Sequence, residues 1–147
     1  IKLHLAAEYM IDTLWEERLE AGDLLLMEDD MLLMETSTVT PPFDLKGSLS
    51  SAMSAGYRPL FAHPERCRFL EVKDCEELVK MGVRLQLNIA SLTGYYGQTA
   101  KVKAEALLKK DMYYAYGSDC HRVRTINEQY SRPELSKDII QKLSIIA

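Results

Sequence analysis

Short apolar runs alternate with amphipathic stretches along the whole chain, and most of the amphipathic stretches end at a glycine. Apolar residues three and four positions apart indicate helices in these stretches, whereas the short apolar runs are typical of strands. This repetition predicts a mostly parallel sheet with helices packed outside it. The apolar runs are 1–7, 24–27, 31–34, 57–62, 83–89 and 112–116, and the predicted helices are 10–21, 43–55, 72–81, 99–110 and 133–146, the last with Ser131 as its N-cap.

The length of the chain limits how many strand–helix units it holds. Each unit is about 30 residues long, as βαβ units are, so 147 residues provide about four to five of them. A closed barrel of eight units takes about 250 residues. We therefore expect an open α/β sheet or an incomplete, C-terminal part of a barrel, forming one domain over residues 1–147. Because the chain begins with Ile1 rather than Met, we also expect that the start of a longer protein is missing.

Composition and charge exclude several classes of protein. Apolar residues make up 47% and charged residues 27%, as in an ordinary globular domain, and the net charge of −4 argues against binding to nucleic acid. No apolar run is long enough to cross a membrane. The odd number of cysteines (Cys67, Cys75 and Cys120), without a CxxC pair, predicts a reducing, cytoplasmic location. The oligomeric state stays open, and an oligomer is compatible with the sequence.

The residues at the predicted strand ends carry the functional signal. Glu8, Glu35, His63, Asp119 and His121 each end or follow one of four predicted strands. The carboxyl ends of parallel strands meet at one side of a sheet, so these side chains are expected to converge. Several carboxylates placed together repel one another unless a cation neutralises them. The mixed oxygen and nitrogen donors favour manganese, iron or zinc, with manganese or iron first.

Each of these residues also has a simpler interpretation. A glutamate at a strand end is often a solvated charge, His63 before a proline can be structural, and Asp119 can form a turn or helix cap. The D-x-H spacing supports the metal hypothesis, because alternate residues of an extended chain share a face, which turns Cys120 away. A Ser–His–Asp triad built from residues 118–121 is disfavoured, since near neighbours rarely meet at the required angles. We expect His4 to be packed or at the surface.

Two motifs resemble those of a known family. HPER at 63–66 and GSDCH at 117–121 resemble motifs of the polymerase-and-histidinol-phosphatase (PHP) family. AAEYM at 6–10 and LME at 33–35 precede them in that family's order. The chain is more similar to the family's bacterial branch of manganese-dependent protein-tyrosine phosphatases, which are encoded with capsular and exopolysaccharide genes. In that branch a similar Gly- and Ser-containing loop lies where this sequence has 88–94, and the resemblance covers essentially the whole chain.

The resemblance implies a distorted, TIM-like α/β barrel with two or three metal ions, here as an incomplete C-terminal part. Glu8 would be a bridging ligand, and Glu35, His63, Asp119 and His121 would complete the protein's share of the ligands. The family's first motif, an HxH pair at the end of the first strand, is absent from this sequence. This absence is expected if the N-terminal part of the domain is missing, and it leaves open whether this chain is active.

The resemblance also implies an activity. Arg66 would hold the substrate phosphate, and Arg122 or Arg124 would replace the family's second arginine, which has no clean counterpart here. We expect hydrolysis of phosphotyrosine on an autophosphorylated bacterial tyrosine kinase that regulates capsular or exopolysaccharide synthesis, assisted by Mn²⁺, with iron or zinc as other possibilities. Asp119 or His121 is our hypothesis for the group that protonates the leaving phenolate. The alternatives are another metal-dependent hydrolase on the same scaffold, and an inactive fragment that retains part of the metal site.

Overall fold

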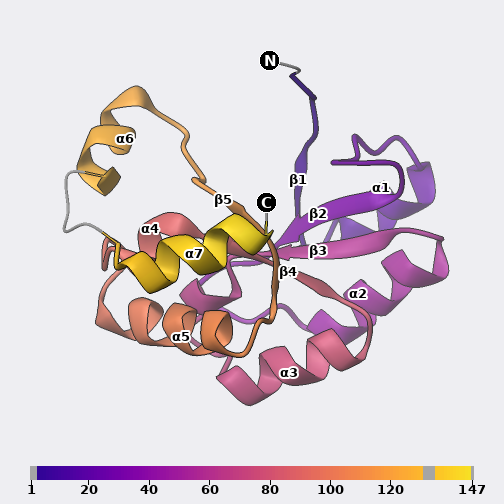
Figure 1. The fold of residues 1–147 in the computed structure, drawn as a ribbon. Helices are drawn as coiled ribbons and strands as arrows, with labels where there is room; N and C mark the ends of the chain where they lie inside the picture. Colours follow the sequence, from indigo (N-terminus) through magenta and orange to yellow (C-terminus); the bar gives the residue numbers. More distant parts are fainter. Residues whose placement is uncertain (1–2, 131–134, 147) are drawn as a thin grey trace.

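A parallel sheet of five strands forms the centre of the molecule (Figure 1). The computed structural model describes residues 3–130 and 135–146. The strands are β1 (Glu8–Met10), β2 (Met31–Glu35), β3 (Arg58–Ala62), β4 (Arg84–Asn88) and β5 (Tyr113–Gly117). The helices are α1 (Trp15–Ala21), α2 (Leu45–Ser54), α3 (Val72–Lys80), α4 (Ile89–Leu92), α5 (Gln98–Lys109), α6 (Val123–Tyr130) and α7 (Lys137–Ile146), and a 3₁₀ helix, η1 (Pro64–Arg66), follows β3.

The strands lie side by side in chain order, so β1 and β5 are the two edges of the sheet. Glu8 on β1 is in register with Leu33 on β2, and Leu33 is in register with Leu60 on β3. Among the described residues β1 and β5 do not pair with each other, and the sheet is open. The predicted α/β class with a parallel sheet is confirmed. The barrel is not seen, because a barrel of this kind closes with about eight strands and the five strands here leave the edges apart.

Apolar side chains from the sheet and the helices form one core. Helices α2, α3 and α5 lie together on one side of the sheet, and α7 runs beside β5 (Figure 1). Leu32, Phe61 and Leu85 come from three neighbouring strands, are fully buried, and share an apolar cluster with Leu49 of α2 and Leu107 of α5. Burial of each such side chain contributes about 1.5–3 kcal/mol, which holds the strand ends in fixed positions.

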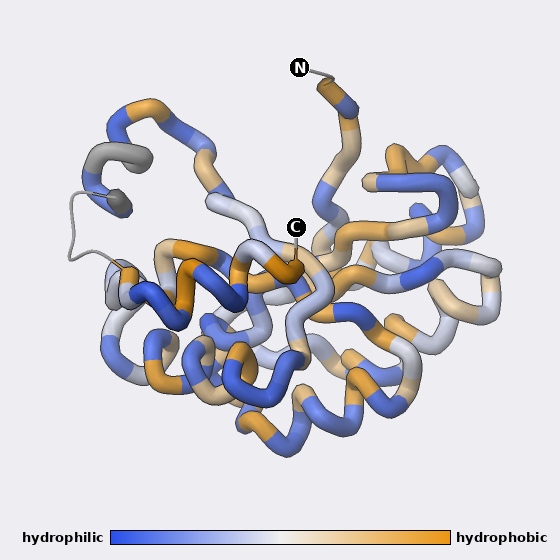
Figure 2. The backbone as a smooth tube through the Cα atoms, viewed as in Figure 1, coloured by the Kyte–Doolittle hydropathy of each residue, from blue (hydrophilic) through white to orange (hydrophobic). Residues whose placement is uncertain are grey.

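The hydropathy of the chain follows this packing. Figure 2 shows apolar residues along the central strands and alternating polar and apolar residues along the helices, as expected for helices with one face on a core. Within residues 3–130 and 135–146, no helix combines the length and the apolar character needed to cross a bilayer.

The first strand differs from the prediction. The alternating run 1–7 is not a strand where the structure describes it, and β1 instead begins at Glu8, while residues 1 and 2 lie outside the described part. Leu3 and Leu5 alternate with polar residues, but they are 94% and 76% exposed. A strand needs partners on its hydrogen-bonding edge and on its apolar face, and this segment has no apolar cover. Glu8 therefore lies within the sheet rather than after it.

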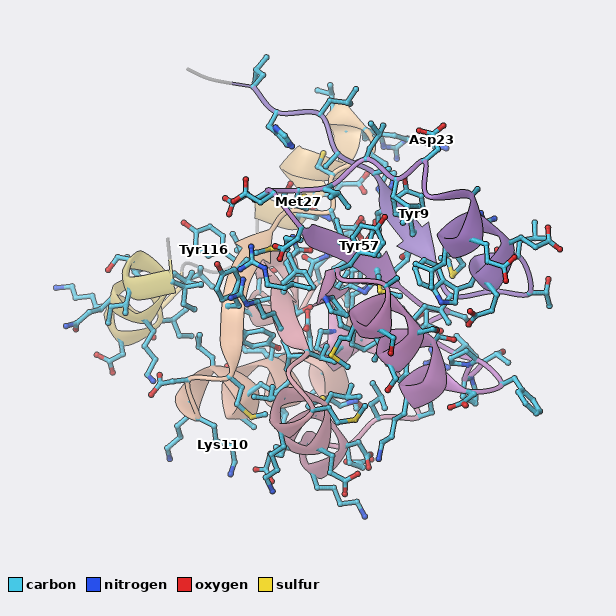
Figure 3. All side chains as sticks on the ribbon, turned by 90° about the vertical axis from the view of Figure 1, so that its right-hand side faces the viewer. Tyr9, Asp23, Met27, Tyr57, Lys110 and Tyr116 are labelled. Atoms are coloured by element: carbon cyan, nitrogen blue, oxygen red, sulfur yellow. The ribbon has the colours of Figure 1, made fainter. Side chains whose placement is uncertain are left out.

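The apolar run at 24–27 is not a strand but part of the loop between α1 and β2, and it is hydrogen-bonded to the segment around β1. The backbone N–H of Leu25 donates to the Tyr9 hydroxyl at 2.8 Å, and the N–H of Ala7 donates to the Leu25 carbonyl at 3.1 Å. The N–H of Met27 donates to the Met31 carbonyl at 2.8 Å, which closes the predicted turn before β2. Tyr9 and Met27 lie on the same side of the molecule in Figure 3.

The helices match the prediction except near their ends. The helix predicted over 10–21 begins at Trp15, because Met10 is still paired with β2 in the sheet. Helix α6 and the single turn α4 were not predicted. The last helix, α7, covers 137–146 of its predicted range 133–146, and Ser131, its predicted N-cap, lies outside the described residues.

Candidate metal and phosphate site

Three predicted ligands meet on neighbouring strands of the sheet, two of them at carboxyl ends and Glu8 at the start of the short strand β1. Glu8 lies on β1, Glu35 is the last residue of β2, and His63 directly follows β3. The Nε2 atom of His63 is 3.5 Å from a carboxylate oxygen of Glu8 and 3.5 Å from one of Glu35. One donor atom from each of the three residues lies within 4.8 Å of the other two, which is close enough for all three to hold one ion. The order and register of the strands produce this convergence, because Glu8 pairs with Leu33, two residues before Glu35, and His63 follows the adjacent strand β3.

The environment of His63 fits a bound cation. His63 is only 3% exposed, and neither of its ring nitrogens has a hydrogen-bond partner among the described residues. Buried polar groups are nearly always hydrogen-bonded, so a buried ring whose Nε2 has only two carboxylates at 3.5 Å points to a bound ligand. Burial lowers the pKa of His63, but the carboxylates of Glu35 and Glu8 raise it more, and the resulting pKa is about 9. A set of two oxygens and one nitrogen is chemically suited to manganese, iron or zinc.

The backbone at His63 is in a rarely occupied conformation. Its φ is 37° and its ψ is 51°, in the left-handed region that costs a non-glycine residue about 1–2 kcal/mol. This conformation ends β3 sharply and begins η1, whose first residue is Pro64. The N–H of His63 donates to the Gln86 carbonyl at 2.8 Å, and the N–H of Arg66 donates to the His63 carbonyl at 2.9 Å. The tight turn therefore brings Arg66 back beside the metal ligands.

Arg66 is held between an acid and an aromatic ring. Its guanidinium forms an ion pair and hydrogen bond with the Asp119 carboxylate, and it lies 4.1 Å from the centre of the Tyr96 ring. The Tyr96 hydroxyl in turn accepts hydrogen bonds from Asn88 Nδ2 at 3.3 Å and from Gln129 Nε2 at 3.2 Å. Sequence reasoning missed Tyr96. The signal for it was the GYYG segment at 94–97, in which both glycines have positive φ and form a tight loop.

One cleft of about 660 Å³ contains most of these groups. Thr36 also lines it, and the Thr36 hydroxyl is buried without a hydrogen-bond partner among the described residues. The ring of Tyr95 meets that of Tyr96 edge to face, with the centroids 4.9 Å apart, and gives the cleft an aromatic wall. The lining residues are Met10, Glu35, Thr36, Ser37, Thr38, His63, Arg66, Tyr95, Tyr96, Asp119, His121 and Arg122.

Asp119 and His121 line this cleft but do not join the cluster of three. Asp119 has a φ of 48°, so the backbone after β5 is not extended as the D-x-H argument assumed, although both side chains line the cleft. The side chain of His121 is 78% exposed, and its Nδ1 lies 3.2 Å from the Asp119 carbonyl. Cys120 is absent from the residues that line the cleft, and its thiol donates to the Arg122 carbonyl at 3.3 Å. The ligand roles of Asp119 and His121 stay predictions.

The two arginines offered as a second phosphate contact differ in position. Arg122 lines the cleft, whereas Arg124 pairs with Glu128 one helical turn along α6, at 2.9 Å, and its side chain is 89% exposed. His4 contacts the Leu26 carbonyl at 2.8 Å and lies outside both the cluster and the cleft lining. Among these candidates, Arg122 is therefore the one that the fold places at the cleft.

The fold and the site together define an α/β protein in which a cluster of two carboxylates and an imidazole lies near the guanidinium of Arg66. Comparison with known proteins identifies the family. Residues 1–142 match the family described as "Capsular polysaccharide synthesis, CpsB/CapC", and the chain belongs to this family. The family assignment agrees with the resemblance seen in the sequence motifs.

Two relatives illustrate how far the similarity extends. The tyrosine-protein phosphatase YwqE of Bacillus subtilis is 34% identical over 76 residues, which are 49% of this chain and 29% of that protein. A chain from the crystal structures of YwqE from Bacillus subtilis and CpsB from Streptococcus pneumoniae, described as unique metal-dependent tyrosine phosphatases, superposes with a TM-score of 0.73 at 22% identity. That match covers 99% of this chain and 63% of the other, so the chain spans less than two thirds of the length of either relative.

Proposed function

We propose that this protein is a metal-dependent phosphomonoester hydrolase that acts on phosphotyrosine in proteins. The observation that carries the proposal is the presence of two side-chain groups in one cleft. One is the cluster of Glu8, Glu35 and His63, within 4.8 Å, of which Glu35 and His63 line the cleft, and the other is Arg66, three residues after His63. A divalent cation and a guanidinium are the groups that most often stabilise a phosphoryl group during transfer. The family assignment and the names of the two relatives support the same activity.

The proposed cofactor is Mn²⁺, with iron or zinc as other possibilities, and two or three ions in a complete enzyme. Glu8, Glu35 and His63 would hold the first ion, and Asp119 and His121 would contribute to a further one. Bound divalent metal supplies a Lewis acid for the phosphoryl oxygens and lowers the pKa of water that it binds. The absence of hydrogen bonds to the buried ring nitrogens of His63, beside two carboxylates, supports this assignment.

The chain's own residues would bind the phosphate and handle the proton. Arg66 presents two N–H groups in a plane that matches two phosphate oxygens, and Arg122 lies in the same cleft as a second cation. Asp119 or His121 would protonate the leaving phenolate oxygen. The exposed His121 ring reaches solvent, from which it can recover its proton. The rings of Tyr95 and Tyr96 would exclude water from one side of the bound ester.

The proposed substrate is a phosphotyrosine protein, namely an autophosphorylated bacterial tyrosine kinase that controls capsular or exopolysaccharide synthesis. The description of the family names capsular polysaccharide synthesis, and both relatives are named as tyrosine phosphatases. We also propose a cytoplasmic location, which rests on the odd number of cysteines.

The test is a comparison of substrates with the metal-loaded chain. We expect Mn²⁺-dependent phosphate release from a phosphotyrosine peptide, and at least tenfold slower release from the phosphoserine peptide of the same sequence. Glu35→Gln should abolish release, whereas Glu20→Gln, an exposed glutamate on α1, should leave it unchanged. Metal binding without phosphate release would favour a non-catalytic fragment. Faster turnover of amides than of phosphate esters would favour another hydrolase on this scaffold.

A further inference from the structure

Glu65 is a buried carboxylate to which the proposed reaction gives no role. It is 1% exposed, although it lies in a turn between two functional residues. Three donors converge on its two oxygens. The N–H of Asn88 and the hydroxyl of Ser91 donate to Oε1 at 3.0 Å and 2.7 Å, and the Tyr113 hydroxyl donates to Oε2 at 3.0 Å. Burial raises the pKa of Glu65, and the hydrogen bonds from Ser91 and Asn88 oppose that rise.

The three donors come from segments that are 23 to 48 residues from Glu65 in sequence. Asn88 is the last residue of β4, Ser91 lies in α4, and Tyr113 is the first residue of β5. A carboxylate that accepts from all three ties the turn after β3 to the two following strands. Removing it would leave three buried donors without a partner, which is a costly state for polar groups in a core.

The turn that Glu65 anchors is strained. His63 has left-handed backbone angles, and such conformations persist only where the surrounding structure over-determines them. Local hydrogen bonds alone do not supply this restraint, because η1 is a single turn of three residues. On the far side, the buried Lys103 donates to the carbonyls of Cys67 and Leu70 and fixes the chain after the turn. Within the turn, the His63 N–H is held by the Gln86 carbonyl of β4, and Glu65 supplies the side-chain hydrogen bonds to β4, α4 and β5.

We propose that Glu65 is a positioning residue, whose hydrogen bonds to Asn88, Ser91 and Tyr113 hold His63 and Arg66 in their places in the cleft. The inference rests on the proposed function, because it assumes that His63 binds metal and that Arg66 binds phosphate. Glu65 itself would contact neither the metal nor the phosphate. It would act through the turn that carries His63 and Arg66.

The experiment measures the two binding steps separately from turnover. Co²⁺ affinity, followed by the visible absorption of the bound ion, reports the position of His63, and inorganic phosphate affinity reports the position of Arg66. We expect Glu65→Ala to weaken both by at least tenfold. Glu65→Gln keeps an oxygen that can accept from Asn88 and Ser91 and an amide that can face Tyr113, so it should stay within about threefold of the wild-type values.

A matched control separates position from general stability. Leu78→Ala, in the core on α3, should lower the midpoint of thermal unfolding while both affinities stay at wild-type values. Wild-type affinities in folded Glu65→Ala would overturn the proposal, as would equal losses in the Ala and Gln variants. If Glu65→Ala does not fold, the double variant Ser91→Ala/Tyr113→Phe removes two of the three donors and is judged by the same tenfold criterion.

The outcome is distinguishable from failure of the proposed function. A wild-type chain that binds Co²⁺ and phosphate without hydrolysing phosphotyrosine contradicts the proposed activity alone. The positioning role is then still decided by the differences in affinity between the Ala, Gln and wild-type proteins.

Discussion

Arg66 and Asp119, 53 residues apart in sequence, form an ion pair inside the candidate site. Their side chains are 20% and 18% exposed, so the pair is largely shielded from water. Both residues have other proposed partners, since Arg66 would bind phosphate and Asp119 would bind metal. Each ligand therefore competes with this pair, and binding of metal by Asp119 would free Arg66 for the phosphate.

From this ion pair we predict that Asp119→Asn increases phosphate affinity in the metal-free chain but decreases metal content and activity in the metal-loaded chain. In the metal-free chain, the variant should bind inorganic phosphate about fivefold more tightly, because a competing carboxylate worth about 1 kcal/mol has been removed. With metal, the same variant should hold less Mn²⁺ and lose phosphatase activity. Titration calorimetry and metal analysis after desalting measure these effects, and circular dichroism confirms the fold. A fully metallated, active variant would contradict the ligand role.

Arg66→Ala should weaken catalysis on phosphotyrosine without loss of metal. The lost contact is a charge-assisted, bidentate hydrogen bond, worth about 1.5–3 kcal/mol, or about 10- to 150-fold in kcat/KM. The control is Arg58→Ala, at the opposite end of β3, where the guanidinium pairs with Asp30. An unchanged kcat/KM for Arg66→Ala would remove this residue from the site.

The two remaining arginine candidates should separate clearly. Arg122→Ala should raise KM for a phosphotyrosine peptide several-fold, because Arg122 lines the cleft. Arg124→Ala should change KM by less than about twofold, because its partner is Glu128 on the surface of α6 and exposed pairs contribute little. Steady-state kinetics of both variants on one peptide decides between them, and the reverse order would reassign the second phosphate contact to Arg124.

Metal binding should release a proton from His63. The carboxylates of Glu35 and Glu8 outweigh burial and raise its pKa to about 9, so the ring is protonated at pH 7.5 in the metal-free chain. A metal ion needs the neutral ring. As the pH is raised towards 9, metal affinity should therefore increase about tenfold per pH unit. Calorimetry in two buffers of different ionisation enthalpy should give about one proton released per bound ion. Affinity that is independent of pH would show that His63 is not a ligand.

In the metal-free chain, the raised pKa of His63 makes the stability of the fold decrease with rising pH, whereas metal affinity increases with rising pH. A raised folded-state pKa means that protonated His63 stabilises the folded state below its ordinary pKa near 6.5, and that this contribution is lost as the pH rises through about 9. The difference in unfolding free energy between the wild type and His63→Gln should therefore shrink over this range, as measured by urea denaturation with a chelator present.

The three cysteines should differ in reactivity. Burial raises the pKa of both Cys67 and Cys75 to about 12, whereas Cys120 is only half-buried, in the segment after β5. A thiol reagent at pH 8 should modify one cysteine per folded chain quickly and all three in denaturant, because only the thiolate reacts. Cys120→Ser should remove the fast phase, and its persistence would show that a core cysteine is accessible.

Sequence periodicity predicted most of the framework. Strands β2 to β5 lie within a residue or two of their predicted ranges, because the apolar runs that mark them are buried in the core. Periodicity failed for 1–7, where Leu3 and Leu5 alternate but have nothing to pack against. Alternation records which side chains would share a face, and it does not show that another element covers that face.

The candidate site also contains residues whose positions could be predicted from the sequence and residues whose positions could not. Glu35 and His63 could be predicted because they end or follow neighbouring strands, whereas Glu8 joins them from the start of β1 and not from the end of the strand predicted over 1–7. The arrangement around Asp119 could not, because a left-handed residue after β5 breaks the alternation on which that prediction relied. A single-residue change of backbone region leaves no periodic signal in the sequence.

The sequence by itself determined the α/β class, the strand ends that bear ligands and the family motifs, because these depend on residue type and on neighbours close along the chain. Tertiary structure alone decided that Arg66 pairs with Asp119 and stacks on Tyr96, and that Glu65 accepts from β4, α4 and β5. Such contacts join residues 23 to 53 positions apart. Their energies exist only after the sheet has brought these segments together, and no local pattern encodes them.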